Sequence, residues 1–279
     1  MFRHLFITIG IILLVTNNSV LSKNVTSKPT ITWLMIHYPP YYISSESSKD
    51  LGVHNRVVDY FKKSLQGYEH RSIMVNVPRL FNTLSKEHDV TYCSPGLGGK
   101  PVDQNVKYSD PMFNSPSPGL VVRRDGPFKK LSKISLREAV GTMGIQIGKP
   151  DEGTYGPKLE EVFKEYPTKF VNFNSSEPRV GNSMVVRKRV HGFLAYSLAF
   201  KYFQNQMEDG DQLKFLPITE NFKYTPTHAI CTDSKRGKEV ISKINSLLKE
   251  QEYKEVVREV FIDLIPKNLK NEFFKANKF

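Results

Sequence analysis

The chain has 279 residues, of which 39% are hydrophobic, and a formal net charge of +12. This length is enough for one large domain or two smaller lobes. Beyond the N-terminus no segment is long and apolar enough to span a membrane. The charge favours an anionic partner such as a membrane surface, a cell-wall polymer or an acidic ligand.

The N-terminus has the pattern of a secretory signal peptide. A basic start at residues 3–4 precedes an apolar run over residues 5–15, and a small polar stretch ends in Val-Leu-Ser at 20–22. We predict a signal peptide over residues 1–22 and a mature chain of net charge +11 that starts near Lys23. An uncleaved anchor is the alternative. Export places the protein in the periplasm or outside the cell, and argues against nucleic acid as a partner.

The nearly continuous apolar run at residues 31–36 is typical of a strand that a parallel sheet buries on both faces. A Pro-Pro pair at 39–40 ends this strand. Three tyrosines, Tyr38, Tyr41 and Tyr42, surround the pair. Ligands of open α/β sheets bind outside the carboxyl ends of strands, so this loop is a candidate ligand wall. The alternative is that the tyrosines only cover the sheet.

Strands and helices alternate through the rest of the first half. We expect helices over residues 53–65 and 79–87, and strands over 73–77 and 90–93. A glycine-rich turn, SPGLGG, then follows and could offer free backbone N–H groups to a ligand. Ordinary turn chemistry is the alternative.

The proline-rich SPSPG at 115–119 predicts a stiff crossover into a second α/β series. Its predicted strands cover 120–122, 144–147, 170–173, 191–196 and 214–217, and its predicted helices include one ending near Tyr166 and one over 176–189. The chain crosses back at 221–227 into a strand over 227–232, and Asp233 is expected to cap a helical tail. Short basic clusters at 123–124, 129–130 and 187–189 are interpreted as solvated surface.

Two cysteines, Cys93 and Cys231, lie in the strand-like runs HDVTYC and THAIC. An even pair in an exported protein indicates a disulfide, and two buried free thiols are the alternative. CxxC and HExxH are absent and the seven histidines lack ligand spacing, so we expect no metal and no cofactor.

The order of these motifs resembles the bacterial extracellular (periplasmic) solute-binding proteins of the amino-acid-binding, family 3-like type. The resemblance covers nearly all of the mature chain and rests on ITWLMIHYPPYYI, LGVHNRVVDYF, HDVTYCSPGLGGKP, KYSDPMF, GIQIGKPDEGTYGPKLEEVF, RKRVHGFLAYSLAFKYF and HAICTDSKRGKEVISKINSLLKE. It implies an α/β, two-lobed type 2 periplasmic-binding fold, in which each lobe is a mainly parallel sheet flanked by helices and two crossover strands join the lobes. We expect lobe 1 over 23–116 and 227–279, and lobe 2 over 117–226. Ligand binds between such lobes, which close by a hinge motion.

Two departures concern the ligand. The resemblance implies an Arg after the glycine-rich turn for a ligand carboxylate, and an Asp at the end of the late second-lobe strand for a ligand amine. Here residues 99–104 contain no Arg, and Ala195 and Tyr196 stand at the second position. Since each contact is charge-assisted in a desolvated cleft, we expect the ligand not to be a free α-amino acid.

Candidate cleft residues follow the carboxyl ends of strands and the starts of helices. Arg79, in the first turn of a helix, is the cation predicted for an anionic ligand group, and residues 154–156 open a second-lobe helix whose N-terminus can hold an anion. An exposed Arg and an ordinary N-cap are the alternatives. The predicted ligand-binding residues are His37, Tyr38, Tyr42, Arg79, Ser94, Gly96, Gly98, Thr154, Tyr155, Gly156 and Tyr196.

The sequence therefore predicts a monomeric, exported solute-binding protein that captures a small polar or anionic solute for uptake or sensing, with an inner-membrane transporter or sensor as partner. No catalytic residue is predicted, because the candidate stretches are poor in Glu and Asp. Two alternatives remain. One is an enzyme on the same fold, such as a dehydratase or a cell-wall-associated enzyme, and the other is a sensor or partner-binding module without a small ligand.

Overall fold

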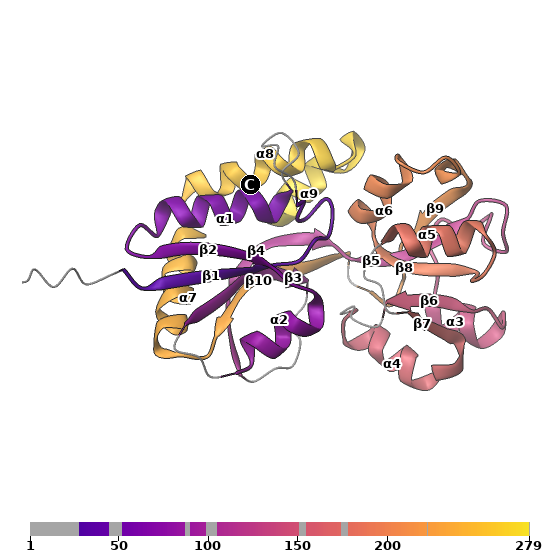
Figure 1. Ribbon diagram of the computed structural model, residues 1–279. Helices are drawn as coiled ribbons and strands as arrows, with labels where there is room; N and C mark the ends of the chain where they lie inside the picture. The colour runs from indigo at the N-terminus through magenta and orange to yellow at the C-terminus, as the bar shows by residue number, and fades with distance from the viewer. Residues whose placement is uncertain are drawn as a thin grey trace, which may run out of the picture.

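The chain folds into two α/β lobes, each built on a five-stranded mixed sheet (Figure 1). The computed structural model describes residues 28–44, 52–86, 90–98, 105–150, 155–173, 178–221 and 223–278. Among these residues no helix is long and apolar enough to cross a membrane. No group of His, Cys, Asp and Glu within the same ranges could hold a metal ion.

The sheet of lobe 1 has the order β2-β1-β3-β10-β4. Strand β1 is parallel to β2 and β3, whereas β10 is antiparallel to β3 and β4. The strands are β1 (Thr30–Met35), β2 (Glu69–Met74), β3 (Thr91–Gly98), β4 (Val106–Pro116) and β10 (Tyr224–Thr232), and the helices are α1 (Val53–Ser64), α2 (Val77–Leu84), α7 (Lys235–Leu247), α8 (Gln251–Leu264), the short 3-10 helix η4 (Lys267–Leu269) and α9 (Lys270–Asn277).

The apolar run of β1 is continuous because helices cover both faces of the strand. Trp33 is fully buried on one face, in a cluster that contains Phe61 of α1 and Phe261 of α8. Leu34 is fully buried on the other face, in a smaller cluster with Leu80 of α2. Helix α8 packs along α1 on the outside of the lobe (Figure 1).

The sheet of lobe 2 has the order β7-β6-β8-β5-β9. Strand β6 is parallel to β7 and β8, and β5 is antiparallel to β8 and β9. Helices α3 and α4 lie on one side of the sheet, and α5 and α6 on the other (Figure 1). The strands are β5 (Pro118–Arg123), β6 (Ile147–Pro150), β7 (Phe170–Phe173), β8 (Gly192–Tyr196) and β9 (Leu213–Leu216), and the helices are α3 (Leu136–Thr142), α4 (Pro157–Glu165), η2 (Pro167–Lys169), α5 (Pro178–Val186), α6 (Ser197–Gln204) and η3 (Gly210–Gln212).

The chain passes between the lobes twice, from β4 to β5 and from β9 to β10. The two crossings are hydrogen-bonded to each other. The Ser117 N–H donates to the Lys223 carbonyl at 3.1 Å, and the Ser117 and Thr225 hydroxyls are 2.5 Å apart. The amide of Asn221 also donates to the Pro118 carbonyl at 3.2 Å. This pairing makes the two crossings one narrow connection.

A disulfide joins Cys93 of β3 to Cys231 of β10, which decides between the two alternatives that the sequence left open. The two residues face each other in the antiparallel register, and their Cα atoms are 4.0 Å apart. Both are fully buried in the core of lobe 1.

Several predicted elements are confirmed and several details are wrong. The strand predicted over 144–147 is β6, which begins only at Ile147 and ends at Pro150. The strand over 170–173 and the helix from Val53 are confirmed. The predicted glycine-rich turn is wrong, because β3 continues through Gly98 by pairing with β10. Strand β2 starts at Glu69, four residues before the prediction, because its pairing with β1 extends over exposed polar residues. The cap of α7 is Ser234, whose hydroxyl accepts from the Gly237 N–H, while Asp233 pairs with lysines instead.

Candidate functional site

The loop after β1 is fastened to the start of α1. Its own turn is closed by the Tyr42 N–H, which donates to the Tyr38 carbonyl at 3.1 Å. The first N–H groups of α1 donate to the loop, from Val53 to the Pro40 carbonyl at 3.2 Å and from His54 to the Tyr41 carbonyl at 2.6 Å. These bonds satisfy helix donors that would otherwise lack partners, and they fix where the loop tyrosines point.

The close approach of this loop requires glycine at position 52. A Cβ atom there would lie 2.5 Å from the carbonyl oxygens of both Pro40 and Tyr41. Asn55 fastens the end of the loop to α1, since its side-chain oxygen accepts from the N–H groups of Gly52 and Ile43, each at 3.0 Å. The aromatic loop is therefore a rigid part of lobe 1.

Three tyrosines bring the two lobes into contact. Tyr38 and Tyr41 come from the loop of lobe 1, and Tyr196 ends β8 of lobe 2. The ring of Tyr196 meets those of Tyr38 and Tyr41 edge-on, with centroids 6.3 and 6.0 Å apart, and the two loop rings stack at 6.0 Å. The Tyr41 hydroxyl is 2.5 Å from the hydroxyl of Ser115, near the end of β4. We call Tyr38, Tyr41 and Tyr196 the tyrosine cluster.

The hydroxyls of Tyr38 and Tyr41 stay protonated in the tyrosine cluster. Burial, with smaller contributions from Tyr196 and Tyr41, raises the pKa of Tyr38 well above its usual value, against the effect of a hydrogen bond with the Tyr196 backbone. Burial also raises the pKa of Tyr41 against the effect of the Ser115 hydrogen bond. At neutral pH both phenols are uncharged, so they suit polar and aromatic contacts with a ligand rather than proton abstraction.

A histidine behind the cluster is also uncharged at neutral pH. Burial lowers the pKa of His54 to about 4, and its ring lies 5.8 Å from the ring of Tyr41 and 6.1 Å from that of Phe113. Its Nε2 atom is buried and makes no hydrogen bond to the residues that the structure describes. His54 therefore acts as an aromatic support of Tyr41.

The other loop residues predicted for the site lie around the cluster. His37 is exposed, and its Nδ1 accepts from the Ser44 N–H at 3.2 Å. Tyr42 is half-buried, and burial together with the nearby Asp59 raises its pKa. Their roles toward a ligand stay predictions.

Helix α2 lies on the side of lobe 1 that adjoins lobe 2 (Figure 1), and Arg79 is in its first turn. Its backbone N–H donates to the capping side chain of Asn76 at 3.0 Å, and its side chain is exposed. The Arg79 guanidinium makes no ion pair with any residue in the described ranges. An exposed cation next to the other lobe is consistent with the predicted role, which stays a prediction.

The structure places Ser94, Gly96 and Gly98 inside β3. Ser94 is 3% exposed, and Gly98 is paired with Thr227 of β10. Gly96 has a φ of +130°, and a Cβ atom on it would lie 2.8 Å from the His228 carbonyl oxygen. These residues are therefore part of the β3 strand and of its irregular pairing with β10. The glycine-rich turn with free backbone N–H groups that the sequence predicts is absent at residues 94–98.

The start of α4 differs from the prediction as well. Thr154 lies outside the described residues. Gly156, with a φ of +90°, is the residue before the helix. The Tyr155 side chain is 5% exposed, donates from its hydroxyl to the Pro150 carbonyl at 3.2 Å and packs edge-on against Phe163 at 5.3 Å. Tyr155 is thus part of the lobe 2 core.

The sequence does not single out Tyr41, a member of the contact between the lobes, or Ser115, which holds Tyr41 from within lobe 1. Tyr41 was named only as part of an aromatic loop, although it contacts Tyr38, Tyr196 and Ser115. The orientation of each ring depends on the hydrogen bonds from α1 to the loop, which no local pattern reveals. Ser115 was read only as part of a proline-rich crossover.

No known protein family matches the chain, and no curated protein matches it. Solved structures do match over most of its length. An ancestral arginine-binding protein bound to arginine aligns with a TM-score of 0.65 and 16% identity, over 85% of this chain and 98% of that one. A histidine kinase sensor domain with similarity to periplasmic binding proteins aligns with a TM-score of 0.66 and 11% identity, over 86% and 96%.

A third similar structure is an ancestral amino-acid-binding protein that is a precursor of cyclohexadienyl dehydratase, with a TM-score of 0.61 and 14% identity, over 86% of this chain and 96% of that one. Sequence identities this low carry information about architecture, and function must be argued from the site. The two sheets, the two crossings and these alignments together show that the chain has the two-lobed type 2 periplasmic-binding fold.

Proposed function

We propose that the mature protein is an exported solute-binding protein that captures a small polar or anionic ligand between its lobes, for uptake or sensing. The observation that carries this proposal is the tyrosine cluster, in which side chains of both lobes meet beside a narrow two-stranded connection. A ligand that touches both lobes favours the closed arrangement by its higher affinity for it.

The chemistry of the contact region favours particular ligands. The loop tyrosines offer uncharged hydroxyls and aromatic faces, and Arg79 offers a cation from lobe 1. Tyr196 stands at the position where the resemblance implies an Asp for a ligand amine. The ligand that fits best is thus polar or anionic, without a requirement for an ammonium group.

A transporter or a sensor is the proposed partner of the protein. The similar structures include the substrate-binding protein of an amino acid ABC transporter as well as the kinase sensor domain. Export is tested by measuring the mass of the protein secreted by its native host. We expect a chain that starts near Lys23, and a soluble cytoplasmic chain that retains Met1 would contradict the proposal.

The ligand is sought by a thermal-shift screen of small metabolites and cell-wall fragments, followed by titration of each hit. We expect Arg79→Ala to weaken binding by about 1.5–3 kcal/mol, the usual size of a hydrogen bond to a charged group. Folding should be nearly unchanged, because Arg79 is exposed. Arg56→Ala, at an exposed arginine of α1, is the matched control. A hit that binds Arg79→Ala and the parent protein equally would contradict the assignment of Arg79.

Free α-amino acids are expected to bind weakly or not at all, because both charged anchors are absent from the sequence. Calorimetric titration with the standard amino acids checks this expectation. Micromolar affinity for any of them would show that the protein holds its anchors at other positions.

The second candidate function is a sensor or partner-binding module that works without a small ligand. The observation favouring it is that the protein's own rings make the contact between the lobes. Small-angle scattering separates the candidates: a ligand-driven protein shrinks when a screened compound binds. A ligand-independent module instead expands only when the contact is cut, as in Tyr196→Ser.

A further inference from the structure

A hollow on the outer face of lobe 2 gathers three arginines. It has a volume of about 260 Å³ and runs along α5, from Arg179 in its first turn to Arg189 in the turn that follows the helix. This is below the roughly 300–1,000 Å³ of pockets for drug-sized ligands, so it suits a ligand of few heavy atoms. The lining residues are Arg179, Val180, Ser183, Met184, Arg187 and Arg189.

Helix periodicity aligns three polar side chains along this hollow. Arg179, Ser183 and Arg187 follow one another at intervals of four residues, which places them in one row on the helix surface. The row continues past the end of α5, because the Arg187 N–H still donates to the Ser183 carbonyl at 3.0 Å. Arg189 joins from the turn, where its N–H donates to the Met184 carbonyl at 2.9 Å.

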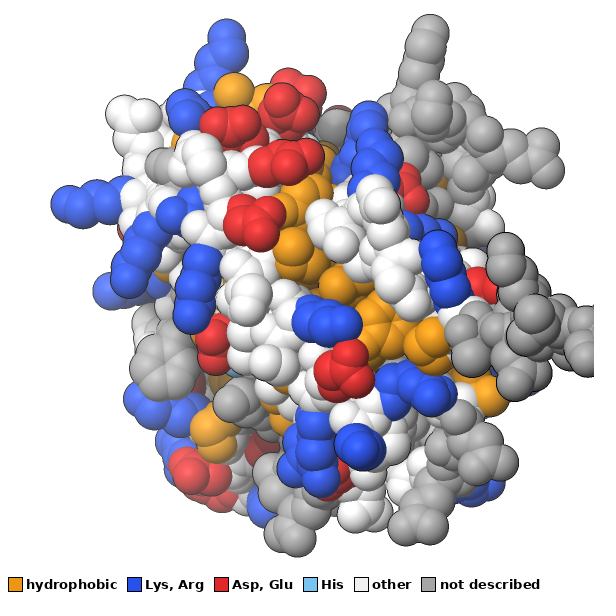
Figure 2. Space-filling model, turned by 90° about the vertical axis from the view of Figure 1, so that its left-hand side faces the viewer, with side chains coloured by type: hydrophobic (Ala, Val, Ile, Leu, Met, Phe, Trp, Pro, Cys, Tyr) orange, Lys and Arg blue, Asp and Glu red, His pale blue; other side chains and the backbone are white. Residues whose placement is uncertain are grey.

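Among the residues that the structure describes, no acid pairs with the arginines of the hollow. Arg179, Arg187 and Arg189 are exposed, and none of them forms an ion pair within the described part of the chain. Other arginines of lobe 2 are paired there, as Arg123 is with Asp125 and Arg137 with Glu165. On the outer end of lobe 1, basic side chains are spread among acidic ones (Figure 2). Like charges gathered in one hollow repel one another unless an anion joins them.

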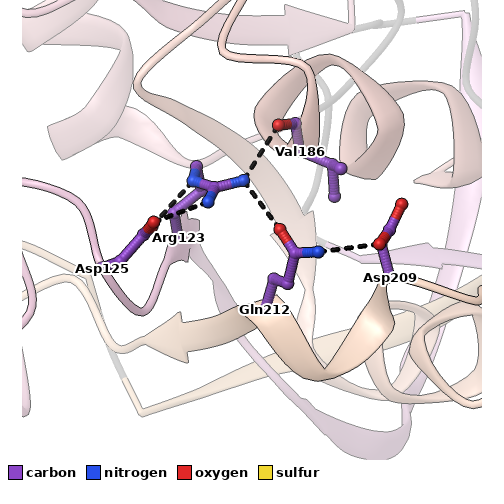
Figure 3. Close-up of polar contacts among 5 residues, drawn as sticks. All are labelled: Arg123, Asp125, Val186, Asp209 and Gln212. Carbon is purple, nitrogen blue, oxygen red and sulfur yellow. Dashed lines mark hydrogen bonds and ion pairs between the residues drawn. The ribbon is translucent and has the colours of Figure 1, made fainter.

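The arginines stand on a rigid support. Gly181 lies so close to the ring of Phe193 that a Cβ atom would overlap it, which holds α5 tightly on the sheet. Arg123 caps the end of the helix, since its guanidinium donates to the Val186 carbonyl and to the Gln212 side chain, each at 2.9 Å (Figure 3). The hollow is therefore a formed feature of the surface.

The end of the hollow formed by Arg187 and Arg189 is separate from the contact between the lobes. Tyr196 pairs with Pro118 at the start of β5, whereas Val186, the last residue of α5, contacts Arg123 at the end of β5. Five residues of strand separate Pro118 from Arg123, which is roughly 16 Å. An anion bound by Arg187 and Arg189 would not touch the tyrosine cluster.

We propose that the hollow is a second binding site, which takes a multiply charged phosphate group held by Arg179, Arg187 and Arg189. Guanidinium groups match phosphate oxygens with paired hydrogen bonds, and the Ser183 hydroxyl adds a further donor. Val180 and Met184 form the apolar wall of the site.

The test is calorimetric titration of the mature protein with pyrophosphate, inorganic phosphate and acetate at low ionic strength. We expect saturable binding that weakens in that order, because more charge on the anion satisfies more guanidinium groups. The double variant Arg187→Gln/Arg189→Gln should weaken pyrophosphate binding at least about tenfold. The matched control Arg56→Gln/Arg71→Gln, at two exposed arginines of lobe 1, should change it less than about twofold.

Equal weakening in both double variants would overturn the inference, because it would mean binding by net charge alone. Absence of saturable pyrophosphate binding would overturn it as well. Loss of binding in Arg79→Ala with none in Arg187→Gln/Arg189→Gln would place the anion at the contact between the lobes instead. The inference therefore stands or fails independently of the proposed function.

Discussion

The two lobes share an architecture and differ in what stabilises them. Lobe 1 holds a large apolar cluster around Trp33, a small one around Leu34 on the other face of its sheet, a disulfide and C-terminal helices that cover its outer side. Lobe 2 has two smaller apolar clusters, one on each face of its sheet. Around them lie two polar networks centred on Arg123 and Glu220. The described chain has both of its cysteines in lobe 1.

The difference shows that one fold can be stabilised by covalent and apolar means in one half and by charge-assisted hydrogen bonds in the other. Apolar burial and a disulfide are insensitive to pH and salt near neutrality. Hydrogen bonds to charged groups depend on the ionisation of their partners. Lobe 1 should therefore respond most to loss of its disulfide, and lobe 2 most to loss of charged hydrogen-bond partners.

Removal of the disulfide should have the largest effect. Cys93→Ala/Cys231→Ala opens a loop of 138 residues, and such a cross-link contributes about 2–5 kcal/mol. We expect calorimetry to show a lower melting temperature for lobe 1 and an unchanged transition for lobe 2. A fall of both transitions together would show that the lobes unfold as one cooperative unit.

Arg123→Gln should destabilise lobe 2 by about 2–3 kcal/mol, because it leaves the partly buried acceptors of Val186 and Gln212 without their charged donor. The Arg123 side chain is 17% exposed, whereas the side chain of its neighbour Arg124 is exposed and donates from its Nε to the Asp211 carbonyl. Arg124→Gln is therefore the matched control. Denaturant unfolding should show a clear loss of unfolding free energy for Arg123→Gln and little loss for Arg124→Gln. Equal losses in the two variants would contradict the role of the Arg123 network.

His54 gives lobe 1 its own pH dependence. Its folded pKa of about 4 lies below the ordinary 6.5, so the unfolded chain takes up the proton first as the pH falls. Stability is complete above pH 6.5 and decreases by about 1–3 kcal/mol as the pH falls toward 4. His54→Phe should flatten this part of the stability profile, while His37→Gln, at an exposed histidine, should leave it unchanged.

Glu220→Gln should have the smallest effect, about 1 kcal/mol on lobe 2. The Glu220 carboxylate accepts from the N–H groups of Leu136 and Arg137 at the start of α3 and from the Ser135 hydroxyl. Burial opposes ionisation, but these hydrogen bonds outweigh it and lower the pKa of Glu220.

The stabilisation by Glu220 is therefore present above the ordinary pKa of a glutamate and is lost as the pH falls through the lowered value. Thermal unfolding at pH 7 and at low pH measures it. Glu138→Gln, at an exposed glutamate in the first turn of α3, is the control. A deficit in Glu220→Gln that persists at low pH would contradict this account.

Most of the fold follows from local pattern, whereas most of the contact between the lobes does not. The apolar run around Trp33 and the alternation of strands and helices predicted both sheets, because burial on two faces leaves a continuous apolar signal. The pairing of β3 with β10 through Gly98 was missed, because antiparallel pairing across more than 120 residues leaves no local trace. Tyr155 is predicted at the ligand site but lies in the lobe 2 core for the same reason: only tertiary packing decides which tyrosine enters a core.

The disulfide has a consequence for how the protein responds to a protease. Residues 93–231, which contain all the strands of lobe 2, form a closed covalent ring. A single cut anywhere within that ring leaves two fragments that still migrate as one molecule in electrophoresis without reductant. Only after reduction do they separate, so a cut in lobe 2 would not release either end of lobe 1.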